Sequence, residues 1–513
     1  MGKRVRFDED ARQSLWRGID QLASAVRITL GPRGRSVVLD RAQGHLPTIT
    51  RDGIAVAQEL ELPDPFENMG VHMLREVAQR TGAEAGDGTT TATVIAHRIV
   101  GDGFAAVRAG GNPVAVRRGV ETAVAAALQE LARLARPVED ERDLAHVATL
   151  ASGDAEVGDA IARAIAEVGP DGVVTVEEGS GHGLTLEVVD GLRLPSGYAS
   201  PYFVTDAEDM EVALDHPLVL VVDGVLTRPA EIVPALEIAA RQDRPLLCVC
   251  EDLSTDALAV LVVNRLRGTA PGLAVRMPGT PAERRAWLED LALVTGATLL
   301  GYGTGIAPTA VTAAHLGRAV RACANADFTT VTGGGGRTEQ VRAALVRCDD
   351  ERRARLAGRV AVLRVGGPEG PEREARRAQV EDALGATQAA LEEGLVPGGG
   401  AGLLRLVDAV SALDVRPLDR PGRDAVVAAL AAPAWWIAAN AGADAASVLE
   451  RVRAGGEWTG FDALSGGLVE LDRAGIVDPA KVARCALLHA GSLASVVLTT
   501  DALVVDDGEK PVA

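Results

Sequence analysis

The chain has 513 residues, and its 52 Lys and Arg residues against 71 Asp and Glu residues give a formal net charge of −19. So acidic a chain disfavours nucleic acid as a partner and is not attracted to an anionic membrane. The length predicts about three domains, with cores large enough to need no metal or disulfide. The N-terminal sequence lacks the apolar stretch of a signal peptide, so we expect a soluble, cytoplasmic protein.

Five cysteines at irregular spacing indicate a reducing compartment. Cys248 and Cys250 lie in an apolar run that predicts a strand, and we expect their thiols to face opposite sides of it. The Ala-rich stretch 425–441 contains Pro433 and is shorter than the roughly 20 residues that cross a bilayer. It predicts a buried pair of helices or a kinked helix.

Both ends of the chain have the apolar periodicity of helices, and the middle alternates strands with helices. Terminal helices are expected at residues 10–30, 53–80, 86–100, 114–134, 372–393, 399–412, 422–441 and 479–499. In the middle, strands are expected at 171–179, 184–191, 216–224, 244–252 and 271–279, and helices at 229–242, 254–267 and 281–296. This order predicts one helical domain built from both ends, with an α/β domain inserted through it.

The most informative motif is Gly-Asp-Gly-Thr-Thr-Thr at residues 86–91, directly before an apolar-periodic helix. The first N–H groups of a helix suit a phosphate, and Thr hydroxyls add further donors. Asp87 would repel a phosphate unless it holds Mg²⁺, which bridges carboxylate and phosphate oxygens. An ordinary Asp or Thr helix cap is the simpler alternative, but three hydroxyls exceed what a cap needs.

Other candidate positions are weak when taken singly. Residues 29–34 and 396–400 are Gly-rich turns beside helices, and the chain lacks the phosphate-loop motif G-x-x-x-x-G-K-[ST]. Asp52, Asp382 and Asp478 lie beside Gly, Pro or a helix start, where a single Asp is usually a turn or cap residue. Local sequence physics does not bring these carboxylates together.

Eight segments occur in order along the chain: TLGPRGRSVVLD, TITRDG, FENMG, AGDGTTTATV, AGGNPVAVRRG, SPYF, VEDALGATQAALEEGLVPGGG and GIVDPAKVAR. Together they resemble the group I chaperonins, the GroEL family, from about residue 3 to residue 506. The resemblance implies a multi-domain α and α/β chaperonin subunit. Its domains would be a helical equatorial domain (1–133 and 393–513), a small intermediate domain (134–190 and 360–392) and an inserted α/β apical domain (191–359).

The resemblance also implies a chaperone that binds unfolded polypeptides in a ring cavity and uses ATP and Mg²⁺. The subunits would form a homo-oligomer, a heptameric ring or double ring, that takes a GroES-like lid. Asp87 would hold Mg²⁺, Asp382 would position the attacking water, and Asp52 would support Asp382. Further nucleotide contacts would come from Thr29, Leu30, Gly31, Pro32, Gly88, Thr89, Thr90, Thr91, Gly399, Phe461, Asp462, Ala463 and Asp478.

In the inserted domain, the resemblance implies an apolar groove between two helices that binds clients and the lid. The matching residues are Tyr198, Tyr202, Phe203, Val233, Leu236, Leu258, Val262, Val263 and Asn264. By helical spacing alone such a stripe is more often part of a core. The family pattern favours an exposed partner site instead.

The chain departs from the family pattern where ion pairs are usual. Ser196 and Gly370 replace both halves of an inter-subunit pair, and Ala83 removes an inter-domain one, whereas Glu393 and Arg484 remain. The usual Gly-Met-rich tail is missing. These changes put cooperative ATP cycling in doubt and leave an alternative function, a binding or scaffold oligomer with weak ATPase activity.

Overall fold

The computed structural model describes residues 3–40, 47–169, 173–179, 183–206, 210–301, 303–336, 359–367 and 371–506. The chain forms two compact units. Unit 1 contains Met1–Arg163, Ser180–Leu184 and Val365–Ala513, and unit 2 contains Ala164–Gly179 and Thr185–Arg364. Unit 1 is therefore built from both ends of the chain, as the order of helical and α/β segments predicts.

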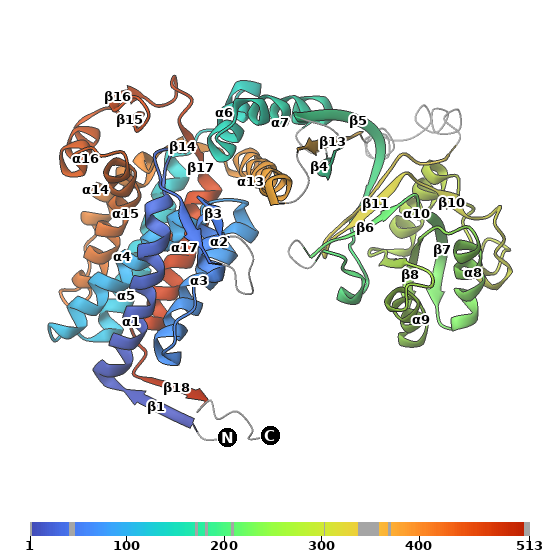
Figure 1. Ribbon diagram of the computed structural model, residues 1–513, viewed down its shortest axis with the longest axis horizontal. Coiled ribbons are helices and arrows are strands. Elements are labelled where there is room, and N and C mark those ends of the chain that lie inside the picture. The colour runs from blue at the N-terminus through green and yellow to red at the C-terminus, as the bar shows by residue number, and fades with distance from the viewer. Residues whose placement is uncertain are drawn as a thin grey trace. The chain divides into compact units, whose positions relative to one another are not determined.

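Unit 1 is mostly helical (Figure 1). The predicted helix at 53–80 is instead two helices, because Pro63 and Pro65 interrupt it and Pro65 starts the second. Pro433 lies inside one continuous helix. The helices, including α7, whose last turn belongs to unit 2, are α1 (Asp8–Val26), α2 (Gly53–Glu59), α3 (Pro65–Ala85), α4 (Thr89–Arg108), α5 (Pro113–Leu134), α6 (Glu141–Ser152), α7 (Ala155–Val168), α13 (Pro371–Glu393), α14 (Ala401–Ser411), α15 (Arg420–Asn440), α16 (Ala445–Ala454) and α17 (Ala480–Val497).

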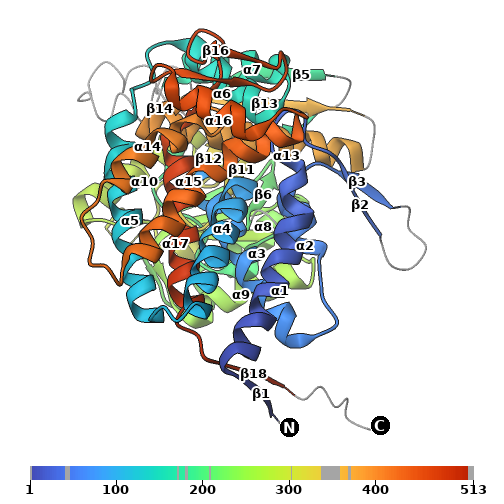
Figure 2. The same cartoon turned by 90° about the vertical axis from the view of Figure 1, so that its left-hand side faces the viewer.

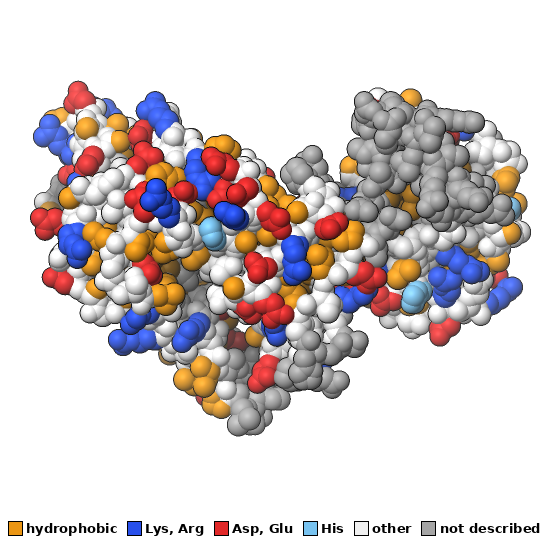
Figure 3. Space-filling model, turned by 90° about the horizontal axis from the view of Figure 1, so that it is seen from above, with side chains coloured by type: hydrophobic (Ala, Val, Ile, Leu, Met, Phe, Trp, Pro, Cys, Tyr) orange, Lys and Arg blue, Asp and Glu red, His pale blue; other side chains and the backbone are white. Residues whose placement is uncertain are grey.

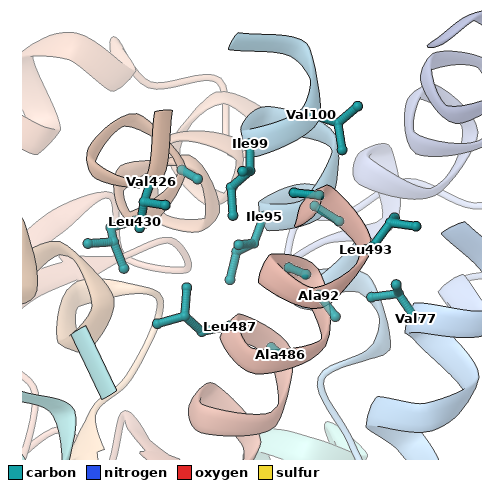
Figure 4. Close-up of a cluster of buried hydrophobic side chains, with 14 of the residues drawn as sticks. Val77, Ala92, Ile95, Ile99, Val100, Val426, Leu430, Ala486, Leu487 and Leu493 are labelled. Atoms are coloured by element: carbon teal, nitrogen blue, oxygen red, sulfur yellow. The ribbon is translucent and has the colours of Figure 1, made fainter. Parts of the chain in front are cut away.

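The core of unit 1 lies where α4 and α17 meet each other and their neighbours α3, α5 and α15. Figure 4 shows Ile95 and Ile99 of α4 beside Leu487 of α17 and Leu430 of α15, and all four side chains are completely buried. Figure 2 shows these long helices side by side. Burying one such side chain contributes about 1.5–3 kcal/mol, so this packing fixes the helices whose ends carry the candidate site.

Short antiparallel strand pairs complete unit 1. They are β1 (Lys3–Phe7) with β18 (Ala502–Asp506), β2 (Val37–Leu39) with β3 (Thr48–Thr50), β14 (Leu395–Pro397) with β17 (Val477–Pro479), and β15 (Thr459–Asp462) with β16 (Gly467–Glu470). The first pair sets Lys3 opposite Asp506, so the two ends of the described chain lie together (Figure 1). The third pair sets Val396 opposite Asp478 and so brings the second Gly-rich turn to this carboxylate.

Unit 2 is an α/β unit with two sheets among its described residues. One sheet has the order β4-β13-β5-β12-β11-β6, and the other has the order β10-β7-β8-β9 with β7, β8 and β9 parallel. The strands are β4 (Val173–Glu178), β5 (Gly183–Leu194), β6 (Val212–Asp215), β7 (Leu218–Leu226), β8 (Leu246–Leu253), β9 (Gly272–Arg276), β10 (Gly317–Arg318), β11 (Arg321–Ala324), β12 (Thr329–Thr332) and β13 (Arg359–Gly366). The first two residues of β5 and the last two of β13 belong to unit 1. The helices are α8 (Val233–Arg241), α9 (Thr255–Leu266) and α10 (Pro281–Thr295).

The first five residues of β8 are an apolar, buried run, as expected for a parallel strand covered on both faces. The expectation that Cys248 and Cys250 face opposite sides of this strand is wrong, because residues two apart in a strand share a face. Both thiols are buried, and a hydrogen bond with Cys248 is the main reason that the pKa of Cys250 is raised.

Acidic and basic side chains are interspersed over the face of unit 1 seen in Figure 3. One described helix, α17, is long and apolar enough to pass for a membrane span by composition. Its apolar character has another cause, because 61% of that window is buried and its residues pack in the core of unit 1.

Candidate functional site

The turn between α3 and α4 forms the first part of the site. Gly86 (φ 72°) and Gly88 (φ 87°) adopt the left-handed conformation on either side of Asp87. Gly88 caps α4 without a side-chain hydrogen bond, so the first N–H groups of the helix face outward without intrahelical partners. Three half-buried threonines follow, whose hydroxyls make no hydrogen bond to any residue in the described ranges: Thr89, Thr90 and Thr91.

Three aspartates converge on this turn. Asp52 is the N-cap of α2, and its carboxylate accepts hydrogen bonds from Ile54 N at 2.9 Å and Ala55 N at 3.1 Å. Burial raises the pKa of Asp87, and the charge of Asp52 raises it further. Burial likewise raises the pKa of Asp478 to about 7, with the charge of Asp87 as the second cause. Asp87 is thus close enough to both Asp52 and Asp478 for their charges to repel.

A second helix N-terminus contacts Asp478. Gly399 (φ 64°) and Gly400 (φ 77°) precede α14, which has no side-chain cap. The N–H groups of both glycines donate hydrogen bonds to Asp478 and partly oppose the effect of burial on its pKa. A Cβ added at Gly399 would meet nothing closer than Phe461 O at 3.8 Å, so the space beside this turn is open.

The loop after α1 carries the predicted contacts Thr29, Leu30, Gly31 and Pro32. Thr29 Oγ1 donates a hydrogen bond to Val26 O at 2.9 Å, and Gly31 is left-handed with φ 84°. This loop is fixed by a residue that sequence analysis missed. Asn440, at the end of α15, donates from Nδ2 to Leu30 O at 2.9 Å.

A hairpin from β15 to β16 adjoins the same loop, because Arg33 donates to Leu464 O at 2.7 Å. The hairpin carries Phe461, Asp462 and Ala463. Burial raises the pKa of Asp462, but hydrogen bonds from Ser465 and Leu464 outweigh it and leave the pKa lowered. Neither Arg33 nor Asn440 carries a local sequence signal for these contacts, since their partners lie more than 400 positions away.

Helix α13, which carries Asp382, packs against the turn between α3 and α4. Asp382 lies inside α13, so its interpretation as a turn or cap residue is wrong. Gly385, one turn further along, packs against the first turn of the site: a Cβ on Gly86 would lie 2.5 Å from Gly385 Cα. The glycine contact therefore places the helix that carries Asp382 against the turn that carries Asp87.

The donor set fits a magnesium nucleotide. Mg²⁺ in proteins is commonly held by one or two carboxylates together with phosphate oxygens of the substrate. Within the described ranges no three His, Cys, Asp or Glu side chains are grouped to hold a metal alone. A cation beside Asp87 would relieve the repulsion among the aspartates, and the N–H groups of α4 with the three Thr hydroxyls suit phosphate oxygens.

The groove residues predicted in unit 2 divide by burial. Tyr202 is 71% exposed, Val233 and Val263 are exposed, and Leu258 and Val262 are half-buried. Two of the expected groove residues do not face outward, because Phe203 is completely buried and Leu236 is 5% exposed, both in the core of unit 2.

The two other predicted groove residues lie at the edge of this set. Tyr198 is partly buried against the core, and its backbone bridges Val275. Asn264 donates a hydrogen bond from Nδ2 to Val260 O, one turn earlier on α9.

The departures from the family pattern lie at described positions, except Gly370, which is outside the described residues. Ser196 accepts a hydrogen bond at its backbone O from Thr329 Oγ1 (2.8 Å), and Ala83 is exposed on α3. The pair that the sequence retains is formed. Arg484 Nε donates to both carboxylate oxygens of Glu393 at 2.9 Å.

These features define a class: a helical unit that is built from both chain ends and carries a candidate nucleotide site, with an α/β unit inserted in its sequence. The sequence model of the TCP-1/cpn60 chaperonin family matches residues 22–508, and the chain belongs to this family. The match confirms the predicted GroEL-like chaperonin fold, with its multi-domain α and α/β architecture.

Solved structures of one relative have the same fold. Chaperonin gp146 from the bacteriophage EL 2 (Pseudomonas aeruginosa), crystallised in the presence of ATP-BeFx, is 19% identical to this chain. Its crystal form II gives a TM-score of 0.69 over 98% of this chain and 99% of the other, and crystal form I gives 0.65 over the same shares.

Proposed function

We propose that this chaperonin hydrolyses ATP with Mg²⁺ and couples hydrolysis to the folding of unfolded polypeptides. The observation that carries the proposal is the convergence of Asp52, Asp87 and Asp478 on two glycine-capped helix N-termini, with Asp382 on the adjoining helix. Bound Mg²⁺ would neutralise phosphate charge, and Asp87 would hold it.

The remaining residues of this site would bind and orient the nucleotide. The N–H groups and hydroxyls of residues 89–91 would donate hydrogen bonds to the phosphates, and Gly399 would leave room for the nucleoside beside Phe461. Asp382 would orient the attacking water, with Asp52 in support. Catalysis of this kind is mainly positioning and charge neutralisation.

Exposed apolar side chains on unit 2 support binding of unfolded chains. Tyr202, Val233 and Val263 are exposed there, and exposed apolar patches typically mark partner sites. The complete particle would be a heptameric ring or double ring of this chain, closed by a GroES-like lid. We place the active protein in the cytoplasm, with no nucleic acid or membrane as a partner.

The decisive experiment is Mg²⁺-dependent phosphate release from ATP by the purified protein, with particle size measured on the same samples. Asp382→Asn should lower kcat about a hundredfold, as expected for loss of a group that positions or deprotonates water, and should leave ATP binding intact. Glu374→Gln, an exposed charge on the same helix, is the matched control and should keep full activity. No hydrolysis by the unaltered protein would reject the proposal.

A second candidate function is a binding or scaffold oligomer with weak, non-cooperative ATPase activity. It is favoured by Ser196 and Ala83, where the family's ion-pairing residues are absent. Refolding of a denatured client separates the two functions. Client release in the native state with ATP and a lid protein supports the folding machine, and capture without release supports the scaffold.

A further inference from the structure

One side of α13 carries a stripe of residues that spans the helix from the site to its C-terminal end. At 3.6 residues per turn, Asp382, Gly385, Ala389 and Glu393 recur on nearly the same side. Gly385 meets Gly86 so closely that neither position has room for a side chain. Asp382 and Glu393 lie about 16 Å apart along the same helix. Fixing Glu393 therefore restricts the movement of Asp382.

The middle of the stripe packs against two other helices. Ala389 is buried in a small cluster with Ala85 of α3 and with Val482 and Cys485 of α17. Val482 also closes the other side of the site turn, since a Cβ on Gly88 would lie 2.6 Å from its Cγ1. Helices α3, α13 and α17 therefore meet directly behind the turn that carries Asp87.

Arg484 of α17 joins the ends of the other two helices. Its Nε donates to both carboxylate oxygens of Glu393 on α13 at 2.9 Å, and its NH2 group donates to Glu84 of α3 at 3.2 Å. One guanidinium thus binds two carboxylates on different helices. The planar guanidinium of Arg presents several donors in fixed directions, so it suits such a shared contact better than the point charge of a Lys ammonium.

Glu84 is held by α17 at two further points. Cys485 Sγ donates to Glu84 Oε1 at 3.2 Å, and His489 Nε2 lies 3.2 Å from Glu84 Oε2. His489 is itself fixed by Thr81 Oγ1, 3.0 Å from its Nδ1. The pKa of Glu84 is lowered, and the hydrogen bond from Cys485 is the largest cause. Burial opposes this effect, and Arg484 lowers the pKa further.

Glu84 is the last residue but one of α3, and Asp87 follows three positions later. We propose that Glu84 is a positioning residue: through Arg484 it holds α13, and with it Asp382, in place against the turn that carries Asp87. The inference rests on the proposed ATPase function. In this role Glu84 does not contact the nucleotide. It acts only through the contact among α3, α13 and α17.

The kinetic test compares Glu84→Ala with the unaltered protein. We expect kcat for ATP to fall about tenfold, with KM and the melting temperature unchanged, because a displacement well below 1 Å already costs a substantial factor in rate. Glu84→Gln should restore part of kcat, since its amide oxygen still accepts from Arg484 and Cys485.

Lys481→Gln is the matched control. Lys481 pairs with Glu392 at 2.6 Å and so joins the same α17 and α13 helices without reaching α3. It should leave kcat within twofold of the unaltered protein. An unchanged kcat in Glu84→Ala, an equal loss in Lys481→Gln, or a loss of kcat that follows a lower melting temperature would each overturn the inference.

Hydrogen exchange in the absence of nucleotide tests the contact without relying on hydrolysis. Glu84→Ala should speed exchange of the α13 amides near residues 385–393, and Glu84→Ala combined with Glu393→Ala should add little to the single change. If the unaltered protein does not hydrolyse ATP, the proposed function fails while this readout still decides the inference. Unchanged α13 exchange would overturn it.

Discussion

Asp478 holds its proton more tightly than an ordinary aspartate. Burial, the charge of Asp87 and the opposing N–H groups of Gly399 and Gly400 leave its pKa at about 7, against 3.8 in the unfolded chain. Between these two values the folded protein binds the extra proton, so this group makes stability fall as the pH rises from about 4 to about 7. Above pH 7 the loss of folding stability caused by Asp478 is constant.

Asp478→Asn should remove this pH dependence. Each pKa unit corresponds to about 1.4 kcal/mol, so from pH 5.5 to pH 8 the variant should gain about 2 kcal/mol in stability relative to the unaltered protein. The measurement is the melting temperature of both proteins across this pH range without nucleotide. Asp414→Asn, at an exposed position, is the control, and parallel melting curves for Asp478→Asn would contradict the assigned proton.

At the residue scale, the sequence predicts the individual parts of the site better than their assembly. The Gly-Asp-Gly turn at 86–88 has a local signal, because glycine in the left-handed conformation and a following helix are visible in the motif. Glu84 and Asn440 have none. Their partners are Arg484 and Leu30, about 400 positions away, and only the folded chain brings them together.

At the scale of helices, two crossings depend on reciprocal glycines. A Cβ on Gly18 of α1 would lie 1.9 Å from Glu67 O of α3, and a Cβ on Gly70 of α3 would lie 2.2 Å from Leu15 O of α1. The same relation holds between α5 and α15 at Gly119 and Gly422. Backbones therefore touch where these helices cross.

Gly18→Ala should destabilise unit 1 by at least about 1–3 kcal/mol, the usual cost of overpacking a core. In an exposed helix the same change would instead stabilise by about 0.5–1 kcal/mol. Thermal unfolding of the purified protein measures the sign. Gly456→Ala is the control, since its Cβ would meet nothing closer than 3.5 Å, and a higher melting temperature for Gly18→Ala would refute the close crossing.

Helices were predictable where apolar residues recur at helical spacing. Helix α7 has such a pattern at Val157, Ile161 and Ile165 and was equally predictable, but the expected helices do not include it. The pairing of β1 with β18 could not be predicted from either segment. Each is a five-residue strand, and its partner lies at the opposite end of the chain.

At the scale of the whole chain, the two units differ in how their cores draw on the sequence. The core of unit 2 consists of residues between Leu192 and Val331, whereas that of unit 1 combines residues before Leu131 with residues after Val396. Unit 1 can therefore form only when both ends of the chain are present. The main core of unit 2, in contrast, has all of its residues within one continuous segment of the chain.

A fragment of residues 185–364 should consequently fold alone and unfold cooperatively on heating, as monitored by circular dichroism. A fragment of residues 371–506 should not, because its core residues such as Leu487 pack on Ile95 and its neighbours from the first part of the chain. Equal behaviour of the two fragments would contradict this assignment of the cores. Cooperative folding of the first alone would mean that unit 2 can be altered without loss of unit 1, since each core is closed on its own residues.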